Sequence, residues 1–144
     1  MYHCKELTKI LRRANGMLAK VRHYVLEKEL NSIYYALFSS IMMYGCQVWG
    51  QIKNAIIKKI FKLQKNAVRI KTFSDFRAPT NPVFKRLGIL KLSDNISLQN
   101  CLFVHDALHN KLPSNFRNFF KLSNINRSIS TRNANNGFLF QPYV

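Results

Sequence analysis

The chain has 144 residues, 47% of them hydrophobic, so it is long enough to bury one core and short for two domains. Its 23 Lys and Arg residues and six Asp and Glu residues give a net charge of +17. That self-repulsion favours a polyanionic partner, with nucleic acid first and an anionic membrane surface second. Three widely separated cysteines and no leader pattern argue against a disulfide-rich secreted domain, and we expect an intracellular protein of the nucleus or cytoplasm.

The first predicted helix runs from Lys5 to Val25, where apolar residues repeat at helical spacing within an arc of about 120°. Asn15 and Gly16 in its middle indicate a bend or a close contact with another helix. The face opposite the apolar arc is basic and carries Lys5, Lys9, Arg12, Arg13 and Lys20.

The next segment is an uncharged run over residues 32–52, "SIYYALFSSIMMYGCQVWGQI". A helix that starts near Glu27 enters this run and is apolar nearly all round, which suits either the centre of a bundle or a lipid bilayer. Its length of about 20 residues meets the requirement for a membrane span. Serines and glycines lower its hydrophobicity and basic residues flank both ends, so we expect a buried bundle helix, with the membrane alternative less favoured.

A third helix is predicted from Ile52 to Thr72, with apolar residues on one face. The opposite face is a stripe of cations, namely Lys58, Lys62, Lys65 and Arg69. The segment from Gln51 to Lys71 holds seven cations, including Lys53, Lys59 and Lys71, and no anion that could relieve their repulsion through an i,i+4 ion pair. A phosphate partner explains this pattern better than an ordinary solvated face does.

Shorter helices are predicted in the second half of the chain. Thr80 or Asn81 can cap a helix that has Pro82 in its first turn and Gly88 after its end. Ser93 is the expected cap of a longer helix, Asp94 to Asn110, which Pro113 stops. A last helix from Ser114 to Leu122 would bury Phe116, Phe119 and Phe120.

No stretch alternates clearly enough to require a strand, so the predicted fold is an all-α bundle of about four to six helices. We assign residues 1–122 to the helical domain and its linker helices, and residues 123–144 to an irregular polar tail.

Catalytic groups are not apparent in the sequence. The six acids are isolated, whereas two-metal phosphoryl transfer needs clustered carboxylates. There is no Gly-rich phosphate loop or nucleophile motif, so we predict no catalytic residue and no cofactor. Cys101, His105 and His109 follow at i, i+4 and i+8, but i+8 is more than about 10 Å from i along a helix. At most one adjacent pair of these three could share an ion, and we expect a core cysteine and a half-buried polar face with no metal.

Several blocks occur in a fixed order: "ANGMLAKVRHYV", "LNSIYYALFSSIMMYGCQVWG", "IKKIFKLQKNAVRI" and "FSDFRAPTNPVFKRLGILKLSDNISLQNCLFVHDAL", followed by "NKLP". This ordered set resembles the region that follows the catalytic palm in reverse transcriptases of non-LTR (LINE-type, jockey-like) retrotransposons. The resemblance implies a helical thumb and linker that grip the RNA template and DNA primer. Four residues of the aromatic motif would match the end of one thumb helix and the turn into the basic one: Tyr44, Gly45, Trp49 and Gly50.

The chain departs from that family in lacking the palm, including the F/Y-x-D-D turn whose aspartates hold magnesium. We therefore expect no polymerase activity from this chain alone, and the palm is an expected partner that this sequence does not contain. The chain also looks cut at both ends, as an open reading frame left by a degenerate element copy would be.

The leading prediction is sequence-independent binding of RNA or DNA through backbone phosphates, by the stripe of Lys58, Lys62, Lys65 and Arg69. Lys9, Arg12, Arg13 and Lys20 form a second predicted surface. Four to six engaged cations predict a slope of log K against log salt of roughly −4 to −5 on duplex. Two alternatives stay open: a relic or protein-interaction module with an exposed apolar patch and no nucleic-acid role, and a basic membrane-associated helical protein.

Overall fold

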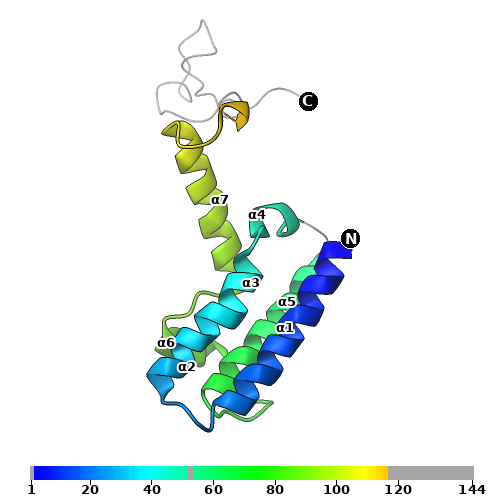
Figure 1. Ribbon diagram of the computed structural model, residues 1–144, viewed down its shortest axis with the longest axis vertical. Coiled ribbons are helices and arrows are strands. Elements are labelled where there is room, and N and C mark those ends of the chain that lie inside the picture. The colour runs from blue at the N-terminus through cyan, green and yellow to red at the C-terminus, as the bar shows by residue number, and fades with distance from the viewer. Residues whose placement is uncertain (1, 52–53, 117–144) are drawn as a thin grey trace, which may run out of the picture. The chain divides into compact units, whose positions relative to one another are not determined.

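The computed structural model describes residues 2–51 and 54–116, and within them it contains helices and no strand (Figure 1). The predicted all-α small bundle is confirmed. The chain divides into two compact units, Met1–Gln99 and Asn100–Val144, which are described separately below. The predicted tail at residues 123–144 lies outside the described residues.

Helices α1 (Tyr2–Val21) and α5 (Asn54–Lys71) lie side by side in the first unit (Figure 1). Asn15 in α1 is buried, and its Nδ2 donates a hydrogen bond to the carbonyl of Leu63 at 3.1 Å. A Cβ added to Gly16 would meet nothing within 4 Å, so the close helix contact predicted at Asn15-Gly16 is made by Asn15. The buried faces of the two helices supply Cys4, Leu7, Leu11, Ala14, Leu18, Ile60, Ala67 and Val68.

Helix α1 ends at Val21, four residues before the predicted end. The turn that follows is tied to α5, because Arg22 Nη1 donates to the carbonyl of Ile70 at 3.3 Å. Local periodicity continued to Val25, but this long-range bond and the reversal of the chain end the helix earlier.

The helix predicted to start near Glu27 forms a rod of three consecutive segments: α2 (Glu27–Ile33), the π-helical turn η1 (Tyr34–Ser39) and α3 (Ser40–Met43). The uncharged run begins in the last turn of α2. Its buried residues recur every fourth position, as Leu30, Tyr34, Phe38 and Met42. In an α-helix, residues four positions apart differ by about 40° in their direction around the axis, so a row of them slowly winds around the helix. The wider π turn reduces this rotation and keeps the four residues on one face. Tyr35 and Ala36 are exposed, so the rod is buried on one face, whereas the sequence predicted burial nearly all round.

The aromatic motif forms a corner at the end of α3. Gly45 has φ 63°, which a residue with a side chain adopts only at a cost, and it leads into the short helix α4 (Cys46–Trp49). Trp49 is 2% exposed, and its Nε1 donates to the carbonyl of Tyr44 at 2.9 Å. A Cβ on Gly50 would collide with the carbonyl of Cys46 and lie 3.0 Å from a methyl carbon of Ile96. The four motif residues thus shape a tight corner, in which Trp49 and Gly50 are buried and Tyr44 is exposed.

Helix α6 (Asn81–Leu87) follows Thr80 as predicted, and Gly88 with φ 62° ends it. Helix α7 (Leu92–Leu108) begins before Ser93, so the prediction of Ser93 as its cap is wrong. The buried side chain of Gln64 in α5 caps the start of α7 instead. Its Oε1 accepts the backbone N–H of Leu92 at 2.9 Å, while its Nε2 donates to the carbonyl of Leu90 at 2.9 Å.

In the second unit the described chain ends with a short 3₁₀ helix, η2 (Ser114–Phe116). Phe116 is 41% exposed and its ring meets the edge of Phe103 at a centroid distance of 5.9 Å, so its predicted burial is wrong. Phe119 and Phe120, which were predicted to be buried with it, lie outside the described residues.

Candidate nucleic-acid interface

A basic groove runs along the seam between α1 and α5. One hollow of about 400 Å³ is lined by Thr8, Arg12, Lys59, Lys62, Leu63, Asn66, Arg69 and Phe76. A second hollow of about 280 Å³ is lined by Cys4, Lys5, Thr8, Arg12, Ile56 and Lys59. The two hollows share Thr8, Arg12 and Lys59, and we call them together the basic groove. None of its lining residues is acidic.

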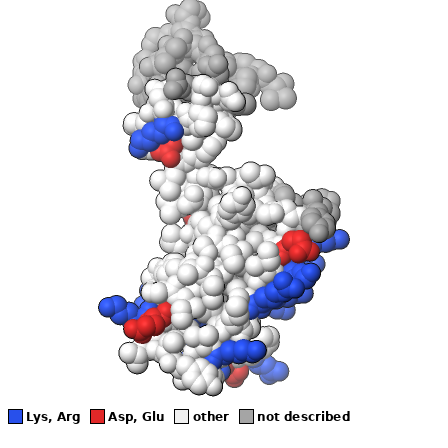
Figure 2. Space-filling view, viewed as in Figure 1, with Lys and Arg blue, Asp and Glu red and all other residues white. Residues whose placement is uncertain are grey.

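In Figure 2, Lys and Arg side chains gather over α1, with an acidic side chain at the amino-terminal end of this patch. Among the residues that the structure describes, five cations line the groove, from both helices: Lys5, Arg12, Lys59, Lys62 and Arg69. Because the helices are packed along their length, cations more than forty residues apart in sequence share one surface. An elongated polyanion is the ligand whose charges match such a surface.

The predicted stripe on α5 is only partly in the groove. Lys62 and Arg69 line it, and Lys58 is exposed outside the lining. Lys65 is half-buried with its Nζ 4.5 Å from the ring centroid of Phe61. Lys58 and Lys65 therefore lie on α5 outside the described lining of the groove.

Arg69 has a second contact that the sequence did not indicate. Its Nε and Nη2 both donate to the carbonyl of Ala78, at 3.1 and 3.0 Å. This bidentate hold ties the loop after α5 back onto the helix. Arg69 therefore contributes charge to the groove while also positioning the loop that carries Phe76.

The second predicted surface divides in the same way. Arg12 lines the groove, whereas Lys9, Arg13 and Lys20 are exposed and do not line it. Lys9 Nζ lies 4.0 Å from Oε1 of Glu6, an exposed pair of small energetic weight. The structure thus brings Arg12 together with the α5 cations and leaves the other three on the surface of α1.

Two lining cations, Lys5 and Lys59, were not among the predicted site residues. Lys59 is about 60° from Lys62 on a helical wheel, at the edge of the predicted stripe. Lys59 could be chosen as a site residue only if the packing of this edge against α1 were known. Helical periodicity does not show which side of a helix packs against a neighbouring helix.

Lys71 was counted among the cations of α5, and the structure places it in the core at 3% exposure. Its Nζ donates to Oδ1 of Asn31. Loss of water on burial lowers the pKa of Lys71, an effect that the charge of Glu27 partly opposes. Lys71 is therefore not available to a partner in the groove.

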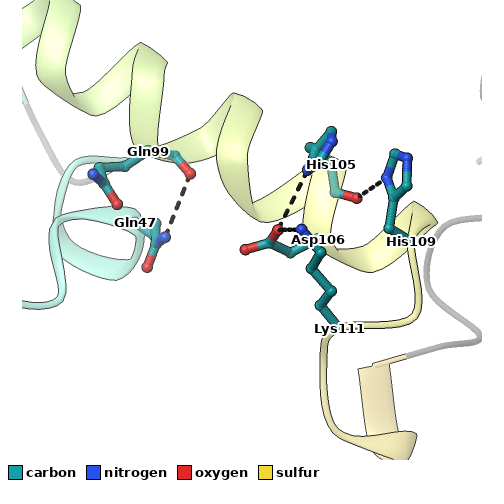
Figure 3. Close-up of polar contacts among 6 residues, drawn as sticks. All are labelled: Gln47, Gln99, His105, Asp106, His109 and Lys111. Atoms are coloured by element: carbon teal, nitrogen blue, oxygen red, sulfur yellow. Dashed lines mark hydrogen bonds and ion pairs between the residues drawn. The ribbon is translucent and has the colours of Figure 1, made fainter.

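The His-containing end of α7 belongs to the second unit and is shown in Figure 3. The rings of His105 and His109 stack at a centroid distance of 4.0 Å, and Asp106 pairs with His105 at 3.3 Å and Lys111 at 3.8 Å. Cys101 is exposed, so the predicted core cysteine is wrong. Within the described residues, no three His, Cys, Asp or Glu side chains are grouped so as to hold a metal ion.

None of the helices in residues 2–51 and 54–116 combines the length and apolarity that a bilayer span requires. Comparison with known proteins adds no assignment. No protein-family model matches the chain, and neither the curated proteins nor the solved structures contain a match.

Proposed function

We propose that this chain is a non-catalytic, all-α module that binds RNA or DNA through backbone phosphates, as the thumb region of a non-LTR retrotransposon reverse transcriptase would. The observation that carries the proposal is the basic groove, where five of the described cations, from two helices, line one seam and no lining residue is acidic. Like charges held close together cost free energy, and bound phosphates would offset that cost.

The groove supports contact with the backbone and not with base edges. Its cations are Lys and Arg side chains from two adjacent helices, and cations of this kind contact phosphate regardless of base sequence. If all five engage a duplex, log K falls against log salt with a slope of about −4.5, and with about −3.5 on a single strand.

The test is a salt titration of binding to a labelled oligonucleotide by fluorescence anisotropy. The variant Lys59→Ser with Lys62→Ser removes two lining charges, and we expect its slope to become shallower by about 2. The matched control is Lys28→Ser with Lys85→Ser, which removes two exposed lysines outside the groove and should leave the slope nearly unchanged. A slope near zero for the unaltered chain, or equal losses in both double variants, would reject the groove as the binding surface.

We propose no polymerase activity for the chain by itself, because its acids are isolated in the sequence and the resemblance does not include the palm. A primer-extension assay with magnesium should show no nucleotide incorporation. Incorporation by the purified chain would contradict this part of the proposal. In the proposal, any magnesium chemistry belongs to a separate palm that this chain accompanies.

A protein-interaction module is the second candidate, and it is favoured by the outer side of the aromatic corner. Tyr44 is 76% exposed and Val48 is 80% exposed, four residues apart. Sedimentation velocity distinguishes the two candidates. Self-association that Tyr44→Ser with Val48→Ser abolishes, together with no binding to RNA or DNA, would favour the interaction module.

A further inference from the structure

Phe76 is an unusual member of the basic groove, because it is a large apolar side chain that is 68% exposed among cations. Its ring centroid lies 5.9 Å from the guanidinium carbon of Arg69. An exposed aromatic ring gains no stabilisation from burial in the protein core. Its position among cations therefore suits a ligand that has both a flat apolar face and negative charge.

The loop that carries Phe76 is held in place by several hydrogen bonds. Arg69 donates twice to the carbonyl of Ala78, and the N–H of Ala78 donates to the carbonyl of Asp75 at 3.0 Å. At the start of the loop, the N–H of Ser74 donates to the carbonyl of Arg69 at 3.1 Å. Phe76 is therefore presented by an ordered loop, which lowers the entropy lost when a ligand stacks on it.

An unpaired nucleobase has the required flat face, whereas the bases of a duplex are already stacked on one another and paired. Stacking on an aromatic side chain beside a cationic track is the general mode by which proteins hold single strands without reading sequence. Phosphates are spaced along the same strand, so one ligand can satisfy the cations and the ring together.

We propose that the basic groove prefers single-stranded RNA or DNA, with phosphates at Arg12, Lys59 and Lys62 and an unpaired base stacked on Phe76. This inference rests on the proposed function and adds the class of nucleic acid. Arg69 acts as a positioning residue, since its hydrogen bonds to Ala78 orient the loop toward the groove.

The test compares a mixed-sequence 12-nucleotide single strand with the 12-base-pair duplex, using anisotropy at fixed salt. Phe76→Ala should weaken single-strand binding by about 5- to 100-fold and duplex binding by less than about twofold. Phe76→Tyr, which keeps an aromatic face, should restore single-strand binding. A 2-aminopurine reporter in the strand should be quenched by the unaltered chain and not by Phe76→Ala, a readout that lost charge or lost stability would not produce.

Phe73→Ala is the matched control. Phe73 belongs to the same loop and is 56% exposed, but its ring lies over Arg22 at 4.7 Å and does not line the groove. We expect this variant to bind both ligands as the unaltered chain does. Equal losses on single strand and duplex for Phe76→Ala, or equal effects of the two Phe variants, would overturn the inference while leaving phosphate binding intact. No binding to either ligand would overturn the inference and the proposed function together.

Discussion

The basic groove and the rod of α2, η1 and α3 are built on one core and use their polar atoms in opposite ways. The groove keeps Arg12, Lys59 and Lys62 at the surface with no acid in its lining. In the rod and its corner, polar atoms turn inward: the hydroxyl of Tyr34 accepts from Gln64 at 3.5 Å, and the indole of Trp49 bonds to the carbonyl of Tyr44.

The difference indicates that the rod contributes mainly to the free energy of unfolding and the groove mainly to binding. Inward polar atoms lose water on folding and need their partners, so changes there should alter the free energy of unfolding. Exposed cations lose little water and contribute little to stability, so changes there should alter binding. The predictions below test this division, in order of decreasing effect.

The largest loss of stability is expected for Gln64→Leu. The buried N–H of Leu92 and the hydroxyl of Tyr34 would both lose their hydrogen bond to Gln64, while Leu fills a similar volume. The carbonyl of Leu90 would keep the bond from Asn95 Nδ2 at 3.2 Å and lose the shorter one from Gln64. We expect the free energy of unfolding to fall by about 3 to 4 kcal/mol in urea denaturation. Gln47→Leu is the control, because Gln47 is exposed and its hydrogen bond to the carbonyl of Gln99, shown in Figure 3, is long at 3.4 Å. It should change stability by less than about 0.5 kcal/mol.

The second prediction concerns the alkaline limit of the rod. Burial raises the pKa of Tyr34 to about 12 from its ordinary value of 10, an effect that the hydrogen bond from Gln64 partly opposes. Between pH 10 and pH 12 the unfolded chain loses this proton while the folded chain keeps it, so stability falls as pH rises through that window. A difference of two pKa units corresponds to a loss of about 3 kcal/mol in the free energy of unfolding by pH 12.

Tyr34→Phe removes the titrating hydroxyl and should remove this part of the pH dependence. Urea denaturation of both proteins from pH 9 upward gives the free energy of unfolding of each as a function of pH. The difference between the two proteins should be constant below pH 10 and should change by about 1.4 kcal/mol per pH unit between pH 10 and pH 12. Parallel curves above pH 10 would show that the phenol ionises equally in the folded and unfolded chains.

The third prediction compares two glycines. Gly50→Ala places a methyl group against the carbonyl of Cys46 and near Ile96, and should destabilise the corner by about 2 kcal/mol. Gly16→Ala places the same group in open space on a helix and should stabilise the protein by up to about 1 kcal/mol. Thermal unfolding of the two variants should therefore shift in opposite directions. Shifts of the same sign would contradict the packing of the corner.

The smallest effect is expected within the basic region, between neighbours on α1. Arg12 lines the groove and Arg13 does not, although both are exposed. Arg12→Ser should make the salt slope of nucleic-acid binding shallower by about 1, and Arg13→Ser should change it by much less. Neither variant should change the urea midpoint, in contrast to the rod variants. Equal slopes for both would mean that the whole basic face of α1 binds, as the sequence alone suggested.

Local patterns predicted most of the helices because helical spacing is a property of neighbouring residues. The apolar arc of α1, the cationic face of α5 and the Pro82 and Gly88 signals around α6 are all read within a few turns. The start of α7 was misjudged, since its first N–H is satisfied by Gln64 from a distant helix and not by Ser93.

For the candidate site, the sequence supplied the cations and not their grouping. It placed Lys62 and Arg69 on one stripe and Arg12 on another, and it omitted Lys59. Periodicity gives the angle of a residue about its own helix axis. It does not give the angle of that helix relative to its neighbour, which decides which flanks meet.

From the residues alone, the chain could be predicted to be all-α and strongly positive, with cations and apolar residues on opposite faces of its two long amphipathic helices, α1 and α5. Tertiary structure alone decided that Arg12, Lys59 and Phe76 line one groove, that Lys71 is buried and that Gln64 caps α7. Helix formation depends on contacts between residues three or four positions apart in the sequence. These features instead depend on contacts between separate helices, which a local pattern does not specify.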